Sequence, residues 1–134
     1  MTTRFLITAL SACFAAAISV PALAAPIQPF SAAALKAAQI AGKPVLVDVH
    51  ADWWPTCRRQ APTITELSHD PAFARLVILK LDFDSQVPAR EALGVSKQST
   101  LVVYKGTRET ARATGIVDRD QIRALVATAT TATR

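Results

Sequence analysis

The sequence lacks the motifs of several large protein classes. It has no glycine-rich phosphate loop, no dinucleotide fingerprint, no Ser-His-Asp arrangement and no internal repeat. We therefore expect neither a nucleotide-dependent enzyme, nor a serine hydrolase, nor a repeat protein. Basic residues are scattered along the chain instead of being clustered, so we predict no nucleic-acid partner.

Cysteine is also scarce, because Cys13 and Cys57 are the only two in 134 residues. Cys13 lies in residues 1–24, which have the pattern of a secretory signal peptide: one positive charge, an apolar run over 5–20 and a small-x-small cleavage site at 22–24. The run is too short and too rich in alanine for a membrane anchor. We therefore expect an exported protein, periplasmic if bacterial, with no integral membrane segment in the mature chain.

A second interpretation of the same region is a lipoprotein. Residues 10–13 resemble a lipoprotein processing box, which would make Cys13 a lipidated amino terminus. The apolar run continues well past Cys13, which favours the signal peptide. Cleavage of that peptide leaves Cys57 as the only thiol, and a single thiol cannot form an internal disulfide. Cys57 is then either buried and inert or reactive toward another molecule.

The remaining chain, about 110 residues, is long enough for one domain with one core. We predict a linker over residues 25–30, a domain over 31–130 and a frayed tail over 131–134. Hydrophobic periodicity, caps and turn signals predict the element order α-β-α-β-α-β-β-α. Strands are expected at 45–49, 76–83, 100–104 and 109–114, and helices at 32–41, from 55 to 68 or 69, at 87–93 and after the cap Asp118.

The turn at residues 105–107 is so short that it can join only antiparallel neighbours, so the last two strands should form a hairpin. The run at 76–83 is apolar and β-branched at its start, which indicates a strand buried on both faces. Together these features predict an α/β fold: a central four-stranded mixed sheet with helices on both faces.

The stretch from Val45 to Pro62 is the most informative part of the chain. An apolar strand leads through a short turn into a helix that begins near Pro55, and Cys57 lies in the first turn of that helix. This order places Cys57 at the carboxyl end of a strand and the amino end of a helix, where backbone N–H groups and the helix dipole favour a thiolate.

This stretch resembles the active-site segment of thioredoxins, in which a strand with a central Asp leads to a Trp, a Cys-x-x-Cys pair and a helix kinked by a Pro five residues later. Asp48, Trp53, Cys57 and Pro62 occupy the matching positions. Trp54 stands where the family has its first cysteine, the exposed nucleophile. The resemblance covers nearly all of the expected mature chain. It implies the thioredoxin fold and the thiol–disulfide oxidoreductase family.

A second departure lies at Ser99. Thioredoxins have a cis proline immediately before the Thr of the third strand, here Thr100, where it presents backbone to a bound substrate. A cis bond before a residue other than proline costs about 3–4 kcal/mol, so we expect the bond between Gln98 and Ser99 to be trans, with the loop adjusted locally.

The resemblance gives Cys57 the role of the resolving thiol and Asp48 that of its buried proton acceptor, with Lys80 as a candidate counter-charge. Disulfide exchange needs an exposed thiolate to attack and a second thiol to resolve the mixed disulfide. With Trp54 in place of the attacker, dithiol exchange is expected to be lost or reduced to one-thiol chemistry at Cys57. The partners would then be protein or peptide thiols and disulfides.

The alternative hypothesis is a non-catalytic module that binds extended polypeptide in the former substrate groove. Trp53 and Trp54 would be its aromatic anchors, with Ser99 and Thr100 beside them. We expect a monomer without a cofactor. His50 should share a face with Asp48 and, with Cys57, forms a conceivable soft metal site, but a lone His more often serves packing or solvation, so we predict no metal.

Overall fold

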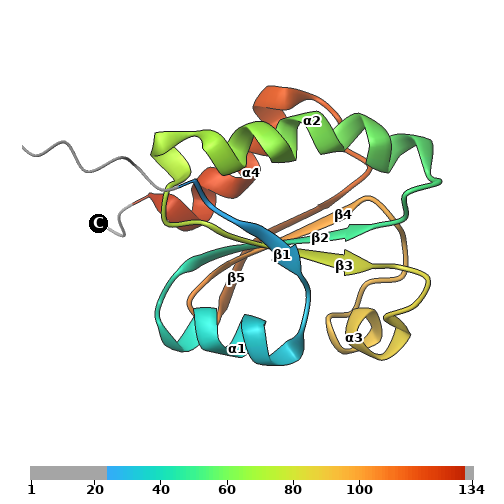
Figure 1. The fold of residues 1–134 in the computed structure, drawn as a ribbon, viewed down its shortest axis with the longest axis horizontal. Helices are drawn as coiled ribbons and strands as arrows, with labels where there is room; N and C mark the ends of the chain where they lie inside the picture. The colour runs from blue at the N-terminus through green and yellow to red at the C-terminus, as the bar shows by residue number, and fades with distance from the viewer. Residues whose placement is uncertain (1–23, 132–134) are drawn as a thin grey trace, which may run out of the picture.

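Five strands form one mixed sheet in the spatial order β1-β3-β2-β4-β5 (Figure 1). The computed structural model describes residues 24–131. β1 pairs with β3 and β3 with β2 in parallel, whereas β2 with β4 and β4 with β5 are antiparallel. The strands are β1 (Ile27–Pro29), β2 (Pro44–His50), β3 (Val77–Asp82), β4 (Thr100–Lys105) and β5 (Arg108–Thr114).

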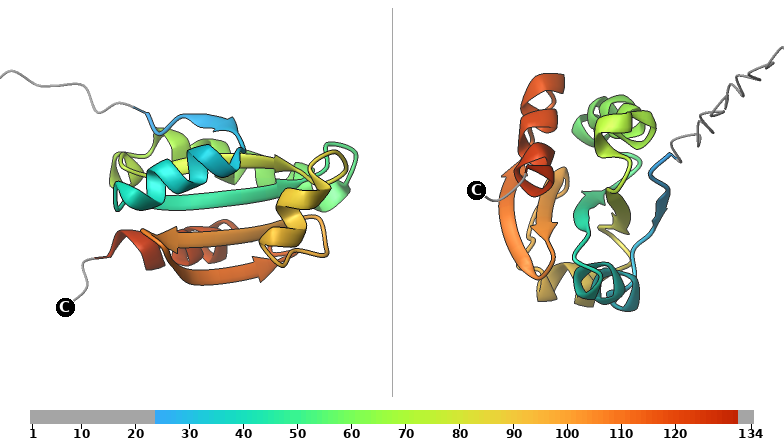
Figure 2. Two further views of the ribbon diagram at one scale, coloured as in Figure 1. Left: turned by 90° about the horizontal axis from the view of Figure 1, so that it is seen from below. Right: turned by 90° about the vertical axis from the view of Figure 1, so that its left-hand side faces the viewer.

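Helices cover both faces of this sheet, with α2 and α4 on one side and α1 and α3 on the other (Figures 1 and 2). Side chains at their amino ends help to fix where helices begin: the Ser31 hydroxyl accepts a hydrogen bond from the N–H of Ala34 at 3.0 Å, and the Asp118 carboxylate accepts one from Gln121 at 2.9 Å. The helices are α1 (Ala32–Ile40), α2 (Pro55–His69), α3 (Val87–Ala92) and α4 (Arg119–Thr130), with a short 3₁₀ turn η1 (Pro71–Phe73).

The predicted mixed sheet with helices on both faces is confirmed, but the sheet has five strands and not four. The extra strand is β1, so the prediction of a linker over residues 25–30 is wrong for Ile27–Pro29. β1 is short and mostly exposed, and it carries no hydrophobic alternation that a sequence pattern could reveal. Its pairing comes from the free edge of β3, as in the hydrogen bond from the N–H of Phe30 to the carbonyl of Lys80 at 2.8 Å. Residues 1–23, with most of the predicted signal peptide and Cys13, lie outside the described part.

The central strand β2 separates two apolar clusters, and all seven of its residues are buried. Val45, Val47 and Val49 belong to the cluster that contains residues of α1, whereas Leu46 belongs to the cluster that contains residues of α2 and α4. Because side chains alternate along a strand, Asp48 shares the α2 side with Leu46.

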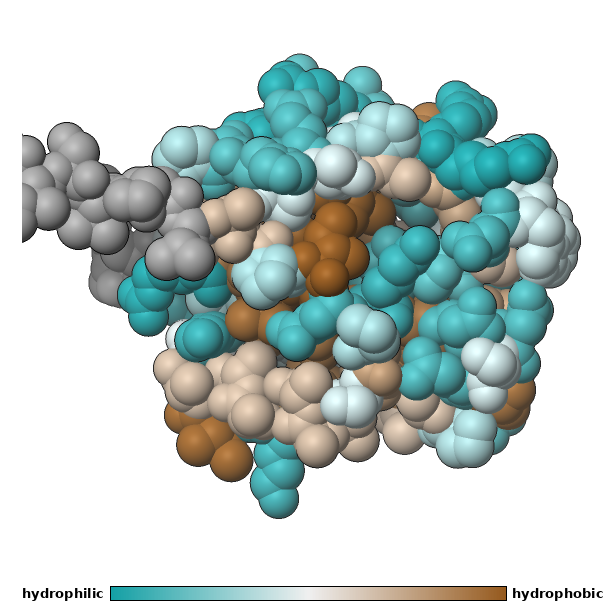
Figure 3. Space-filling view, viewed as in Figure 1, coloured by the Kyte–Doolittle hydropathy of each residue, from teal (hydrophilic) through white to brown (hydrophobic). Residues whose placement is uncertain are grey.

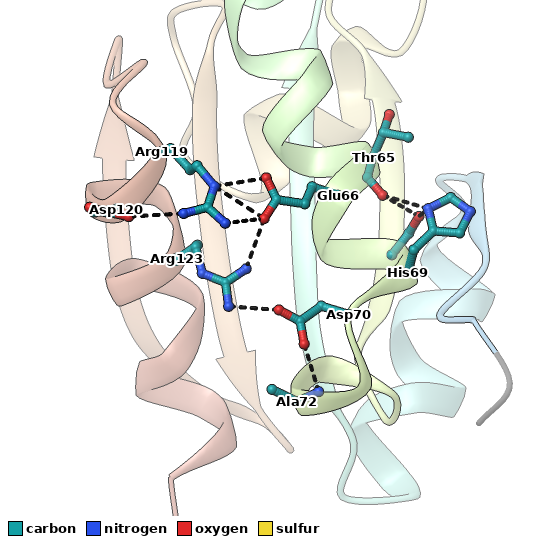
Figure 4. A network of polar contacts seen from close by, with 9 residues as sticks. Thr65, Glu66, His69, Asp70, Ala72, Arg119, Asp120 and Arg123 are labelled. Atoms are coloured by element: carbon teal, nitrogen blue, oxygen red, sulfur yellow. Dashed lines mark hydrogen bonds and ion pairs between the residues drawn. The ribbon is translucent and has the colours of Figure 1, made fainter. Parts of the chain in front are cut away.

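Four charged side chains join α4 to the carboxyl-terminal end of α2 (Figure 4). Glu66 forms an ion pair with Arg119, and Asp70 accepts a hydrogen bond from Arg123 at 2.6 Å. A hydrogen bond from Arg119 lowers the pKa of Glu66. Hydrogen bonds from the backbone N–H of Ala72, the larger cause, and from Arg123 lower the pKa of Asp70. This cluster lies at the end of α2 remote from Cys57.

The surface seen in Figure 3 is hydrophilic over α2 and intermediate over the alanine-rich α1, with hydrophobic side chains in the middle of the face. No helix within residues 24–131 combines the length and the hydropathy that a bilayer-spanning segment requires.

Candidate functional site

A tight turn connects β2 to α2 at the edge where β2 and β3 end (right-hand side of Figure 1). The N–H of Trp54 donates to the carbonyl of Ala51 at 3.0 Å, and α2 begins immediately afterwards at Pro55. Trp54 is the N-cap residue and its side chain makes no capping hydrogen bond. The predicted start of the helix is confirmed, and it places Cys57 in the first turn.

Cys57 is buried, with 7% of its surface exposed. Its sulfur lies 3.0 Å from the hydroxyl of Ser99 and accepts a longer contact of 3.5 Å from the N–H of Ala51. It is the free cysteine of the described residues, which offer no second thiol. An internal disulfide is therefore impossible within residues 24–131, and the thiol has its hydrogen-bonding partners inside the protein.

Asp48 is also buried, with 6% of its surface exposed, and no hydrogen bond joins its carboxyl group to another described residue. Burial raises the pKa of Asp48 to about 6, against the opposing charges of His50 and Lys80. Lys80 is its register neighbour on β3, but the carboxylate that the Lys80 ammonium reaches, at 3.5 Å, is that of Asp52. Lys80 thus acts on Asp48 through its charge and not as an ion-pair partner.

Asp48 and Cys57 line the same small pocket, with a volume of about 60 Å³. The buried His50 lines it with them, while the exposed side chains of Asp52 and Lys80 form its outer part. The remaining lining residues are Arg58 and Ala61. Within residues 24–131 no group of His, Cys, Asp and Glu side chains is arranged to hold a metal ion.

Trp53 and Trp54 form an exposed aromatic pair at the same end of the sheet. They are 57% and 37% exposed, and their rings meet edge to face with centroids 5.5 Å apart. The indole N–H of Trp53 donates to the carboxylate of Asp84 at 2.8 Å, which fixes this ring against the loop after β3. The pair is therefore an ordered aromatic surface beside the amino end of α2.

Ser99 and Thr100 are both buried, at 1% and 3% exposure. The described residues contain no cis peptide bond, so the expected trans bond before Ser99 is confirmed. The loop adjusts by placing Ser99 at a φ of 57°, in the left-handed region. The structure thus brings Ser99 to Cys57. The Thr100 hydroxyl bonds elsewhere, to the carbonyl of Lys97 in the preceding loop at 2.8 Å and to the hydroxyl of Thr114 on β5 at 2.9 Å.

Gln60 is a residue of the site that the sequence analysis missed. It is fully buried, and its amide donates to the carbonyl of Ser99 at 3.3 Å and to that of Ile116 at 2.7 Å. It thereby joins α2 to the loops that precede β4 and α4. The helical periodicity of the sequence could have indicated its burial, because Gln60 lies one turn after Cys57 on the stripe that continues to Ile64.

Comparison with known proteins decides the family, because the family model named Thioredoxin matches residues 29–128. The chain belongs to the thioredoxin family. It is 34% identical to the thioredoxin of Chlamydia muridarum over 87 residues, which are 65% of this chain and 83% of that protein. It is 35% identical to the thioredoxin H-type of Chlamydomonas reinhardtii over 85 residues, 63% of this chain and 74% of that protein. The solved structure of Trxlp from Edwardsiella tarda EIB202 matches with a TM-score of 0.73 and 40% identity, over 75% of this chain and 98% of that one.

The predicted thioredoxin fold is thus confirmed in sequence and in structure. Trp54, at which the resemblance places the attacking cysteine, is the N-cap residue of α2. Ser99, at which the resemblance places the cis proline, contacts the thiol of Cys57.

Replacement of Asp48 by Asn should stabilise the protein at neutral pH. A carboxyl group whose pKa is about 6 when folded and 3.8 when unfolded contributes stability below pH 3.8, and this stability is lost as the pH rises through about 6. Asp48→Asn removes the buried charge, so we expect a gain of up to about 3 kcal/mol above that range. Denaturant unfolding over a pH series measures it.

Asp120→Asn is the control for this experiment, because the Asp120 carboxylate is 87% exposed on α4. We expect it to leave the pH dependence of unfolding unchanged over the same range. If the gain from Asp48→Asn were the same in acid as at neutral pH, then Asp48 would not titrate in this range.

Replacement of Ser99 by Pro should destabilise the protein. Proline locks φ near −65°, whereas Ser99 adopts 57°, so the variant must distort a loop that is bonded to Gln60 and Gly115. We expect a loss of more than about 1 kcal/mol in the free energy of unfolding. Ser99→Gly, measured in parallel, loses the contact to Cys57 but accepts the positive φ, and it should lose less stability. Equal stability of the two variants would mean that the loop rearranges freely.

Proposed function

We propose that this chain is an exported thioredoxin-family protein that does not carry out dithiol–disulfide exchange and that binds extended polypeptide over Trp53 and Trp54. The observation that carries the proposal is which side chain is exposed and which is buried at the start of α2. The family's attacking position is an exposed tryptophan, and the thiol that remains is buried. Export is inferred from the signal-peptide pattern of residues 1–24.

The loss of dithiol exchange follows from the chemistry of the reaction. A thiolate must reach a sulfur atom of the substrate disulfide, and a second thiol must then release the mixed disulfide. Cys57 is 7% exposed and its sulfur contacts Ser99, so a protein disulfide has poor access to it. No other thiol in residues 24–131 could complete the second step. These facts favour binding over one-thiol attack on polypeptide substrates.

The aromatic pair supports the binding role. Tryptophan is enriched among the residues that dominate binding energy, because it offers a large contact area and has few rotatable bonds. The hydrogen bond from Trp53 to Asp84 and the edge-to-face contact with Trp54 hold the two rings in place before any partner binds. A preformed surface loses little conformational entropy on binding. Apolar side chains of an extended polypeptide are the chemistry that fits it.

The binding role predicts that an unfolded polypeptide will bind the wild-type protein. A reduced and alkylated polypeptide is the appropriate probe, because it has neither thiols nor disulfides and can only bind. Trp54→Ala should weaken its affinity in calorimetric titration at least about tenfold, since the side chain removed is one of two anchors.

Ile40→Ala is the matched control, because Ile40 is a large apolar residue that is 76% exposed at the end of α1, on the other face of the sheet. Its affinity should equal that of the wild type. The binding role would be refuted by equal affinity of Trp54→Ala and wild type, or by no binding at all.

Replacement of Trp54 by Cys should restore disulfide chemistry. It recreates Cys-Pro-Thr-Cys over positions 54–57, with the new thiol at the helix cap, where backbone N–H groups stabilise a thiolate. We expect the variant to form an internal disulfide with Cys57 and to catalyse insulin reduction by dithiothreitol, whereas the wild type does not. Recovery should be partial, because Ser99 replaces the family's proline.

Trp53→Cys controls for the mere presence of a second thiol. Position 53 lies one residue too far from Cys57, so this variant should not catalyse insulin reduction. Wild-type turnover comparable to that of an ordinary thioredoxin would contradict the proposed loss of exchange. A folded Trp54→Cys protein without the disulfide would contradict the assignment of position 54.

A further inference from the structure

The small pocket beside Cys57 is the part of the site that polypeptide binding does not use. Its volume is about 60 Å³, and its buried lining includes Cys57 and Asp48. On the same measure about 10–15 Å³ is enough to hold one water, so the pocket has room for a few waters or for one small polar molecule. A protein disulfide or a bulky thiol reagent is far too large for it.

Asp48 indicates that something polar belongs in this pocket. The residue is 6% exposed and its carboxyl group has no hydrogen bond to another described residue, and the Nδ1 of His50, which lines the same pocket, is buried without a hydrogen-bond partner. Buried polar groups are almost always hydrogen-bonded, because an unpaired one costs about 1–3 kcal/mol. The pocket is where a small hydrogen-bonding molecule would meet both this carboxyl group and the sulfur of Cys57.

We propose that Cys57 is a single-thiol oxidation site for hydrogen peroxide, with Asp48 as the base that accepts the thiol proton. Hydrogen peroxide has two oxygen atoms and matches the pocket in size and in hydrogen-bonding capacity. The site selects by size, so that the thiol is closed to proteins and bulky reagents and open to this oxidant.

The reaction balances without any further reagent. Asp48 takes the proton from the Cys57 thiol, and the thiolate attacks one oxygen of the peroxide. The S–O bond forms as the O–O bond breaks, so sulfur is oxidised to a sulfenic acid and the peroxide is reduced. The leaving hydroxide takes the proton back from Asp48 and departs as water.

The oxidised state should persist, because nothing near it can resolve it. A sulfenic acid normally condenses with a second thiol, and residues 24–131 contain none. The burial of Cys57, which is 7% exposed, keeps the thiols of other proteins away from its sulfur. The hydroxyl of Ser99, 3.0 Å from the sulfur, is placed to hydrogen-bond the new group.

Mass spectrometry of the folded protein tests the proposal. With one equivalent of hydrogen peroxide, the peptide that contains Cys57 should gain one oxygen atom. The oxidised cysteine should become trappable by dimedone once the protein is unfolded in the presence of that reagent. The only methionine of the chain is Met1, so oxidation of methionine beyond the leader does not confuse the measurement. The same protein should react at least about tenfold more slowly with tert-butyl hydroperoxide and with a bulky aromatic disulfide, because neither fits.

Asp48→Asn should slow the reaction with hydrogen peroxide at least about a hundredfold, the lower end of the range for general-base catalysis. Asp120→Asn, on the surface of α4, should react at the wild-type rate. The proposal is overturned if the folded protein resists hydrogen peroxide while the denatured chain is oxidised, if the two hydroperoxides react equally, or if Asp48→Asn matches the wild type. Polypeptide binding is measured separately on Cys57→Ser, so failure of one proposal leaves the other standing.

Discussion

The complete burial of β2 is the constraint on which the rest of the molecule depends. β3 and β4 pair with its two edges, and helices cover its two faces, so all seven residues are removed from water. Alternation along the strand then directs Asp48 toward α2. A charged residue fixed in such a place cannot move to solvent. The charges of His50 and Lys80 favour its ionised form, whereas burial and the charge of Asp52 oppose it.

The two departures from the thioredoxin pattern converge on one sulfur atom. On the resemblance to thioredoxins, Trp54 takes the place of the thiol that would face a substrate, and Ser99 gives Cys57 a hydroxyl partner. Proline has no hydroxyl and could not provide this contact. In the proposed function the site consists of one buried cysteine with the two tryptophans as its outer surface.

The elements from α1 to α4 could be predicted from the sequence because their signals are local: caps at Ser31 and Asp118, the apolar run of β2 and the short turn before β5. β1 could not, since three residues pair only because the edge of β3 is free. Cys57 and Asp48 were predicted through the family resemblance. The role of Gln60 was not, because its two acceptors lie 39 and 56 residues away along the chain, and only the folded structure brings them together.

The carboxyl groups near the two ends of α2 gain protons at different pH values. Near its start, Asp48 gains a proton as the pH falls through about 6. At its end, the pKa values of Glu66 and Asp70 lie below their ordinary values of 4.5 and 3.8, because Arg119 bonds to Glu66, and the backbone of Ala72 and the side chain of Arg123 bond to Asp70. The export proposed for this chain would expose it directly to the acidity of its surroundings. In mildly acidic surroundings the site would be uncharged at Asp48 while the clamp between α2 and α4 stays fully ionic.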